Sequence, residues 1–368
     1  MKIKRVDVYN FDLTYVHGTY VMSGGRAISS LPSTLVRVTA DNGLQGWGEV
    51  CPLGTTYLPA HAEGARAALA LVAPAVLGVD PTSPGAVNES MDAALSGHAY
   101  AKSPIDVACW DLTGRALGVS VSVLLGGVRQ EKFPLYMAVP LGTPEEMTAY
   151  VLARRKEGIH RFQLKVGGDP VLDGVRVRQI IEATGAEDLV IADANCGWRL
   201  NEALIAAAAM EGLPRLYLEQ PCPTMEECIE VRKRISLPMV YDEIVMDLPT
   251  LLRASREGGA GAVNLKVSRV GGLSKARLLR DVCDELGIQV TIEDTWGGDV
   301  VSATSAHLAA STRAKSLLTV SFMNDWTREH VAGHQPRSVD GFGSAPAGPG
   351  LGIEVDAARL GKPLFSAG

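Results

Sequence analysis

Several features that would place this chain in a membrane, outside the cell or on nucleic acid are missing from its sequence. No uncharged run of about 18 apolar residues appears, as a membrane-spanning helix requires. The start, MKIKRVDVYNFDL, alternates like a strand and lacks the apolar block of a signal peptide. The six cysteines form no CxxC pair, as expected for reduced thiols. No basic run is present, and the formal charge of −6 disfavours nucleic acid and anionic membranes as partners. We therefore expect a cytoplasmic protein that binds neither.

The first part of the chain, residues 1–128, has the pattern of an α+β domain. The segments KIKRVDVYNFDL, STLVRVTADNG and GLQGWGEV predict a three-stranded antiparallel sheet, with Asp41-Asn42-Gly43 as a hairpin turn. Helical runs follow over 62–78, 81–97 and 103–118, and the last has Pro104 in its first turn and Gly118 at its end. The polar, glycine-containing stretch 15–30 is either a lid over a site or a mobile surface loop.

Strands and helices alternate over the second part, residues 129–335. Eight strand candidates occur there, at 133–139, 161–166, 189–193, 215–219, 238–242, 262–267, 288–294 and 317–322. This alternation favours a parallel α/β barrel of the TIM type, and the length of 368 residues suits such a barrel plus a smaller domain. The Gly- and Pro-rich tail, residues 336–368, is predicted to return to the first domain.

Five ionisable residues end successive strands of the predicted barrel. They are Lys165, Asp193, Glu219, Asp242 and Lys266, at intervals of 28, 26, 23 and 24 residues, each long enough for one strand, one loop and one helix. The carboxyl ends of barrel strands carry the active site, so the five should share one rim. Because strands two and six are diametrically opposed, the two lysines should face each other with the carboxylates between them.

Three carboxylates that converge on one rim repel each other unless a cation is present. All-oxygen ligands without a nearby His or Cys indicate a hard ion, Mg²⁺ or alternatively Mn²⁺, held by Asp193, Glu219 and Asp242. Structural ion pairs with Arg or Lys are the alternative. A divalent ion beside a bound carboxylate acidifies the neighbouring carbon by stabilising an enediolate, and Lys165 and Lys266 are the candidate acid and base. Burial and a neighbouring cation should lower their pKa toward neutrality.

Together with these rim residues, several motifs make the chain resemble the mandelate racemase and muconate lactonizing branch of the enolase superfamily. The motifs that carry the resemblance are GWGEV, DVACWDLTGRALG, LKVG, DAN, EQP, DE and NLKVSRVGG, which span nearly the whole length. The resemblance implies a capping domain over a modified (β/α)7β barrel, with the Mg²⁺ ligands and lysines named above. It also implies that Asn195 and Glu243 orient these groups, and that the protein is a homo-oligomer, often an octamer in this branch.

Two departures from the branch narrow the expected subgroup. The racemases and sugar-acid dehydratases place a His at the seventh strand end, whereas this chain reads IEDTWGGD there. Dipeptide epimerases and cycloisomerases usually read K-x-K at the second strand, and here Gln163 replaces the first lysine. A neutral Gln163 removes one cation that would help to lower the pKa of Lys165.

The stretches TIEDTWGGDVVSA, SGGR and CPLG are similar to the group that acts on proline derivatives. In that group Asp294 would pair with the ring ammonium, unless it is only the N-cap of the following helix. Thr295 and Trp296 would shape the pocket. Aromatic faces from Tyr20, Tyr57, Trp296 or Trp326 would suit a quaternary ammonium, whereas a secondary ammonium requires a carboxylate such as Asp294.

We therefore predict a Mg²⁺-dependent dehydratase that converts cis-3-hydroxy-L-proline to Δ1-pyrroline-2-carboxylate by a two-lysine mechanism. The first alternative is a 2-epimerase of proline or hydroxyproline betaines. A further alternative within the fold is an epimerase of dipeptides or N-acyl amino acids. A non-catalytic barrel protein is the alternative of a different class.

Overall fold

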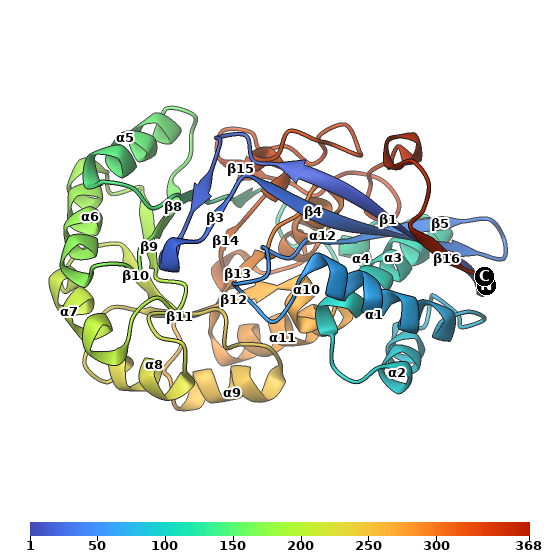
Figure 1. Ribbon diagram of the computed structural model, residues 1–368, viewed down its shortest axis with the longest axis horizontal. Helices are drawn as coiled ribbons and strands as arrows, with labels where there is room; N and C mark the ends of the chain where they lie inside the picture. The colour runs from blue at the N-terminus through green and yellow to red at the C-terminus, as the bar shows by residue number, and fades with distance from the viewer.

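The computed structural model describes residues 1–368 and shows a capping unit joined to a barrel (Figure 1). The capping sheet is antiparallel in the order β16-β1-β4-β5. Its strands are β1 (Ile3–Thr14), β4 (Ser30–Ala40), β5 (Gln45–Val50) and β16 (Phe365–Ala367). The sheet thus has four strands rather than the predicted three, because the C-terminal tail adds β16 beside β1. Both chain termini consequently lie at the same end of the molecule (Figure 1).

Three helices complete the capping unit, α1 (Ala62–Ala75), α2 (Pro84–Ala94) and α3 (Ala99–Leu117). Helix α3 lies directly on β5, and the glycines of the GWGEV motif make this possible. A Cβ atom on Gly46 would lie 2.1 Å from the Ala108 carbonyl oxygen, and one on Gly48 would lie 1.9 Å from that of Pro104. The predicted start of this helix at residue 103 is four residues too late, because α3 begins at Ala99, directly after the left-handed residue His98, and Pro104 lies inside it.

The barrel consists of eight parallel strands in one sheet, in the order β14-β13-β12-β11-β10-β9-β8-β7. They are β7 (Met137–Val139), β8 (Arg161–Lys165), β9 (Leu189–Asp193), β10 (Leu216–Glu219), β11 (Met239–Tyr241), β12 (Ala262–Lys266), β13 (Gln289–Glu293) and β14 (Leu317–Val320). A parallel bridge between Leu135 and Val320 joins the two ends of the sheet.

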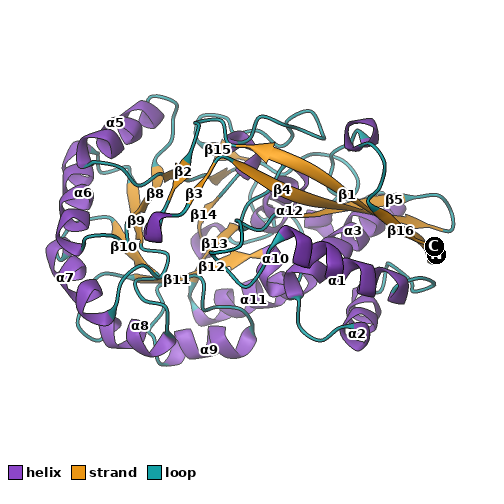
Figure 2. Ribbon diagram, viewed as in Figure 1, coloured by secondary structure: helices purple, strands orange, loops and turns teal.

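Helices connect consecutive barrel strands and form the outer layer (Figure 2). They are α5 (Pro144–Arg155), α6 (Pro170–Ala183), α7 (Leu200–Met210), α8 (Met225–Arg232), α9 (Leu248–Arg256), α10 (Val267–Val270) with α11 (Leu273–Leu286), and α12 (Asp299–Ala310). After β14 the chain forms no further barrel helix and runs back toward the capping unit. The predicted (β/α)7β barrel with an N-terminal capping domain is therefore confirmed. None of the helices has the length and apolar character needed to cross a bilayer.

Short elements join the two units. The stretch 15–30 contains a small hairpin of β2 (Tyr20–Val21) and β3 (Ala27–Ile28) around the 3-10 helix η1 (Ser23–Gly25), so it is more regular than its sequence suggested. Helix α4 (Val121–Leu124) leads toward the barrel, and β6 (Phe133–Pro134) pairs with β15 (Phe342–Gly343) of the tail. The remaining 3-10 helices are η2 (Ala314–Ser316), η3 (Met323–Trp326) and η4 (Ala357–Leu360).

The strand register places the ionisable residues side by side. Lys165 is paired with Asp193 across β8 and β9, and Asp193 with Glu219 across β9 and β10. On the other side of the barrel, Lys266 is paired with Glu293 across β12 and β13. Below this polar layer the barrel interior is apolar, with a cluster of Ile191, Val240, Ala262 and Leu318.

Candidate active site

One small cavity lies above the carboxyl ends of the barrel strands and takes walls from both units. Its volume is about 30 Å³. The capping unit contributes Tyr20, Met22, Leu53 and Tyr57, whereas the barrel contributes both lysines and a group of polar and aromatic side chains. These are Tyr136, Gln163, Lys165, Asn195, Lys266, Glu293, Asp294, Thr295, Trp296, Met323 and Trp326. The structure therefore brings together residues separated by most of the chain length.

The three predicted metal ligands end neighbouring strands and are fully buried. Asp193 pairs with Lys165, and Asp242 pairs with Lys266 at 2.6 Å and with Arg269 at 2.6 Å. Burial alone would raise the pKa of Asp242, but the two adjacent cations outweigh burial and hold that pKa well below its usual range. Ion pairs of the kind expected by the structural alternative are thus present at two of the three carboxylates.

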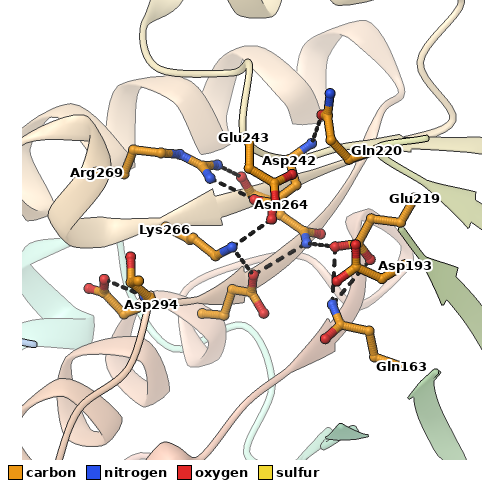
Figure 3. A network of polar contacts seen from close by, with 12 residues as sticks. Gln163, Asp193, Glu219, Gln220, Asp242, Glu243, Asn264, Lys266, Arg269 and Asp294 are labelled. Carbon is orange, nitrogen blue, oxygen red and sulfur yellow. Dashed lines mark hydrogen bonds and ion pairs between the residues drawn. The ribbon is translucent and has the colours of Figure 1, made fainter. Parts of the chain in front are cut away.

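Glu219, the central carboxylate, has no cationic partner among the salt bridges of the chain. It accepts hydrogen bonds only from the side-chain amides of Gln163, at 3.0 and 3.1 Å, and of Asn264, at 2.6 Å (Figure 3). Burial, followed by repulsion from Asp193 and Asp242, raises its pKa well above the ordinary value. A buried carboxylate between two others with no cation beside it fits a divalent ion with oxygen ligands. Asp193, Glu219 and Asp242 are therefore the residues that could hold a metal.

The two lysines have different surroundings. Lys165 donates to Asp193 and, at 2.8 Å, to the Gln163 side-chain oxygen. Lys266 lies 2.6 Å from Asp242 and 3.2 Å from Glu293. A lysine pKa lowered toward neutrality was predicted, but burial, which lowers it, is outweighed here by the adjacent carboxylates. The pKa of both lysines is consequently raised, chiefly by Asp193 for Lys165 and by Asp242 for Lys266.

Asn195 and Glu243 lie beside the carboxylates and are linked to each other. The Asn195 side-chain amide donates to Glu243 Oε1 at 3.0 Å. The hydroxyl of Tyr57 donates to the same oxygen at 2.7 Å and accepts from Lys266 Nζ at 3.1 Å. Burial, together with the charges of Asp242 and Asp193, raises the pKa of Glu243 to about 7. Tyr57 therefore contacts Glu243 and Lys266 through its hydroxyl, in addition to lining the cavity.

Asp294 lies at the cavity but does not cap the following helix α12, whose N-cap is Gly298. Its carboxylate instead accepts from the Ser268 backbone N–H at 2.9 Å, the Ser268 hydroxyl and the Thr295 N–H at 2.7 Å. These contacts fix Asp294 on the short helix α10. Trp296 is packed edge-on against Tyr20 and Trp326, with ring centres 5.3 and 5.7 Å apart.

Four polar residues of the site were not predicted from the sequence. Glu293 is buried beside Lys266, and the Tyr136 hydroxyl donates to it. Asn264 donates to Glu219 and, at 3.2 Å, to Glu293, while Arg269 pairs with Asp242. One of them, Asn264, carried a signal in the sequence. Asn264 precedes Lys266 by two residues, as Gln163 precedes Lys165, and alternate residues of a strand share one face.

The SGGR motif forms contacts between the capping unit and the site. The Ser23 hydroxyl donates to the Asn195 carbonyl at 3.3 Å, and Arg26 Nε donates to the Thr56 carbonyl at 3.0 Å. Arg26 thus ties the stretch 15–30 to the loop 51–60. No histidine lines the cavity.

Comparison with known proteins is consistent with this geometry. The description "Mandelate racemase / muconate lactonizing enzyme, N-terminal domain" matches residues 14–126, and "Enolase C-terminal domain-like" matches 146–359. The cis-3-hydroxy-L-proline dehydratase of Roseibium aggregatum is 43% identical over 99% of both chains. The N-succinyl-L-Arg/Lys racemase of Bacillus cereus is 26% identical over 97% of this chain and 96% of its own.

Solved structures agree with these relatives. A member of the enolase superfamily from Roseovarius nubinhibens ISM, complexed with magnesium, has a TM-score of 0.94 at 35% identity and covers 99% of both chains. The named relatives include a lyase and an isomerase, which confirms the prediction of an enzyme rather than a non-catalytic barrel. The chain belongs to the mandelate racemase/muconate lactonizing enzyme family of the enolase superfamily.

Proposed function

We propose that the enzyme is a Mg²⁺-dependent dehydratase that converts cis-3-hydroxy-L-proline to Δ1-pyrroline-2-carboxylate. The observation that carries the proposal is the pair of lysines that line one cavity from opposite sides of the barrel, with three buried carboxylates on the strands between them. The 43% identity over 99% of the length to a cis-3-hydroxy-L-proline dehydratase supports this substrate.

Asp193, Glu219 and Asp242 would hold the metal. When bound, Mg²⁺ would stabilise the negative charge that develops on the substrate carboxylate as the α-proton leaves. Asn195 and Glu243, which are hydrogen-bonded to each other beside these ligands, would keep them oriented.

The lysines would move the protons of the reaction. One lysine, in its neutral amine form, takes the α-proton, and the electron pair left on the α-carbon forms a double bond to C3 as the C3–O bond breaks. The other lysine, as an ammonium, gives its proton to the departing hydroxyl, which leaves as water. The enamine that remains gains a proton at C3, loses one from nitrogen and becomes the cyclic imine. Asp294 would pair with the ring ammonium, and Thr295 and Trp296 would bound the ring.

The polarity of the cavity supports an amino acid as the substrate. Its walls carry charged and polar side chains from both units. Asp294, a buried carboxylate at this cavity, matches a secondary ammonium in charge.

A second candidate function is a 2-epimerase of proline or hydroxyproline betaines. Tyr20, Trp296 and Trp326 line the cavity together and present aromatic rings in mutual edge contact. A quaternary ammonium is attracted to such rings. Both lysines would then exchange the same α-proton on opposite faces of the substrate.

One assay separates the two functions. The enzyme is incubated in D₂O with Mg²⁺ and each of a panel that contains cis-3-hydroxy-L-proline, trans-4-hydroxy-L-proline and their betaines, and products are followed by NMR. The dehydratase predicts loss of the 3-hydroxyl and formation of the cyclic imine. Exchange at the α-carbon with the hydroxyl retained would instead establish epimerisation, and no reaction with any compound would refute both.

A further inference from the structure

The Lys266 ammonium has three partners that come from three separate parts of the chain. Its Nζ atom donates to Asp242, which follows β11, at 2.6 Å, and forms an ion pair at 3.2 Å with Glu293 at the end of β13. It also donates, at 3.1 Å, to the Tyr57 hydroxyl on the capping loop 51–60. Two partners belong to the barrel, whereas the third belongs to the capping unit.

Tyr57 is itself anchored by the barrel. Its hydroxyl donates to Glu243 Oε1 at 2.7 Å, and Glu243 accepts at the same oxygen from Asn195 at 3.0 Å. Lys266 Nζ also lies 5.5 Å from the centre of the Tyr57 ring. The position of the loop 51–60 and the position of the lysine therefore depend on each other through one hydroxyl group.

A cation bound at Asp242 would compete with Lys266 for that carboxylate. The Tyr57 hydroxyl and the Glu293 carboxylate would then be the partners that fix the ammonium. The hydrogen-bond partners of Lys165, Asp193 and Gln163, both belong to barrel strands, although the capping residue Tyr20 lies close to Lys165. The loop 51–60 is thus joined to Lys266 by a direct hydrogen bond.

We propose that Tyr57, on the loop 51–60, is a positioning residue whose hydroxyl holds Lys266 Nζ at the cavity. The inference rests on the proposed function, in which Lys266 exchanges a proton with the substrate. It differs from a role for Tyr57 as an aromatic wall, because phenylalanine at this position would keep the ring and lose only the hydroxyl.

The first test compares Tyr57→Phe with the wild-type enzyme in steady-state kinetics. We expect kcat to fall about 10- to 100-fold, as for a misplaced catalytic group, while KM changes less than about threefold. Tyr217→Phe is the matched control, since the Tyr217 hydroxyl contacts Gln289 at 3.2 Å, away from the cavity. A wild-type kcat in Tyr57→Phe would overturn the proposal.

The second test needs no turnover. Amide hydrogen exchange of residues 52–58 is followed by mass spectrometry in Tyr57→Phe, Lys266→Met and the double variant, without substrate. Each single variant should exchange at least about tenfold faster than wild type, because each loses the hydrogen bond between Tyr57 and the Lys266 ammonium. The double variant should be no faster than Tyr57→Phe, because that variant already lacks this hydrogen bond and the one to Glu243.

The two tests keep the proposals distinguishable. Unchanged exchange in Tyr57→Phe would overturn the positioning role whatever the substrate. Faster exchange, with no turnover of any panel compound by the wild type, would refute the proposed function and retain the contact between Tyr57 and Lys266. Should Tyr57→Phe fail to fold, as judged by circular dichroism, Glu243→Gln takes its place. It removes the charged acceptor of the same hydroxyl and should also speed exchange over 52–58.

Discussion

Buried carboxylates occur in two regions of this molecule, at the barrel rim and at the seam where the capping unit packs on the barrel. At the seam, Glu49 accepts from the backbone N–H groups of Gly298 at 2.8 Å and Val301 at 3.1 Å, at the start of α12. Asp111 accepts from the N–H groups of Trp47 and Leu351, at 2.9 and 2.8 Å. At the rim, by contrast, Glu219 accepts only from side-chain amides and lies between two other carboxylates.

This difference distinguishes buried carboxylates that stabilise the fold from buried carboxylates that serve a function. Backbone N–H donors are fixed by the fold, so a carboxylate that accepts from them stabilises one arrangement of the two units. Carboxylates that repel one another around a cavity lower the stability of the metal-free protein. Such residues are retained in a sequence where a bound ligand compensates for the repulsion. Rim substitutions should therefore change activity more than stability, and seam substitutions should do the reverse.

The largest effect is expected at the rim lysines. Lys165→Ala and Lys266→Ala should each lower kcat by about 10³-fold or more, because each removes one proton-transfer group. Turnover of cis-3-hydroxy-L-proline in Mg²⁺ checks this, with Lys233→Ala on the exposed end of α8 as control. Full activity in either rim variant would contradict the two-lysine mechanism.

At the seam, Asp111→Ala should lower the free energy of unfolding by about 3 kcal/mol. It leaves two buried N–H groups without their acceptor and removes one of the partners of the Arg115 guanidinium. Urea unfolding measures the loss, and kcat of the folded fraction should stay within about threefold of wild type. If Asp111→Ala lowered kcat without lowering the free energy of unfolding, the proposed difference between rim and seam carboxylates would be wrong.

Mg²⁺ bound at the rim should stabilise the folded protein, and this gain should not depend on the seam carboxylates. At a Mg²⁺ concentration of about 100 times Kd, unfolding free energy should rise by about 2.7 kcal/mol, and chelation should remove both this gain and the activity. Glu219→Gln should lose most of the gain, whereas Asp111→Ala should keep it. Equal stabilisation of wild type and Glu219→Gln by Mg²⁺ would argue against a metal at this carboxylate.

The smallest expected effect concerns His307, a buried seam residue of α12 that contacts the Ser122 hydroxyl at 2.7 Å. Burial lowers the pKa of His307 from about 6.5 to about 4. The unfolded chain then binds the proton more readily than the folded one between these values, so stability falls as pH drops from about 6.5 to 4. Between pH 7 and 4.5 the loss should be about 2.4 kcal/mol. Urea unfolding at pH 4.5 and 7 should show a smaller difference in His307→Asn than in wild type.

Much of the site could be predicted because its residues recur with the period of the barrel. The spacing from Lys165 to Lys266 placed five side chains on one rim, and the register of β8, β9 and β10 shows three of them in direct pairing. Gln163 was identified as a departure, although its contact with Glu219 was not foreseen. Glu293 was missed because its importance comes from the register Lys266↔Glu293, which strand pattern alone does not specify.

The surroundings of the lysines were predicted less well than their positions. A lowered lysine pKa requires a bound cation, whereas the opposite shift follows from the carboxylates that surround both lysines here. Asp294 was assigned either to the substrate or to the start of α12. Its contact with Ser268 on α10 depends on how two neighbouring barrel loops pack, which neither local sequence encodes.

The sequence by itself determined the barrel, the order of the rim residues and the chemistry that they can perform, since these follow from local periodicity and residue type. Only the tertiary structure decided which partners each rim residue has. Tyr57 and Lys266 are 209 positions apart in the chain, and β16 joins β1 from the far terminus. Such contacts arise from the packing of one unit on the other, where surface shape rather than local pattern determines which side chains meet.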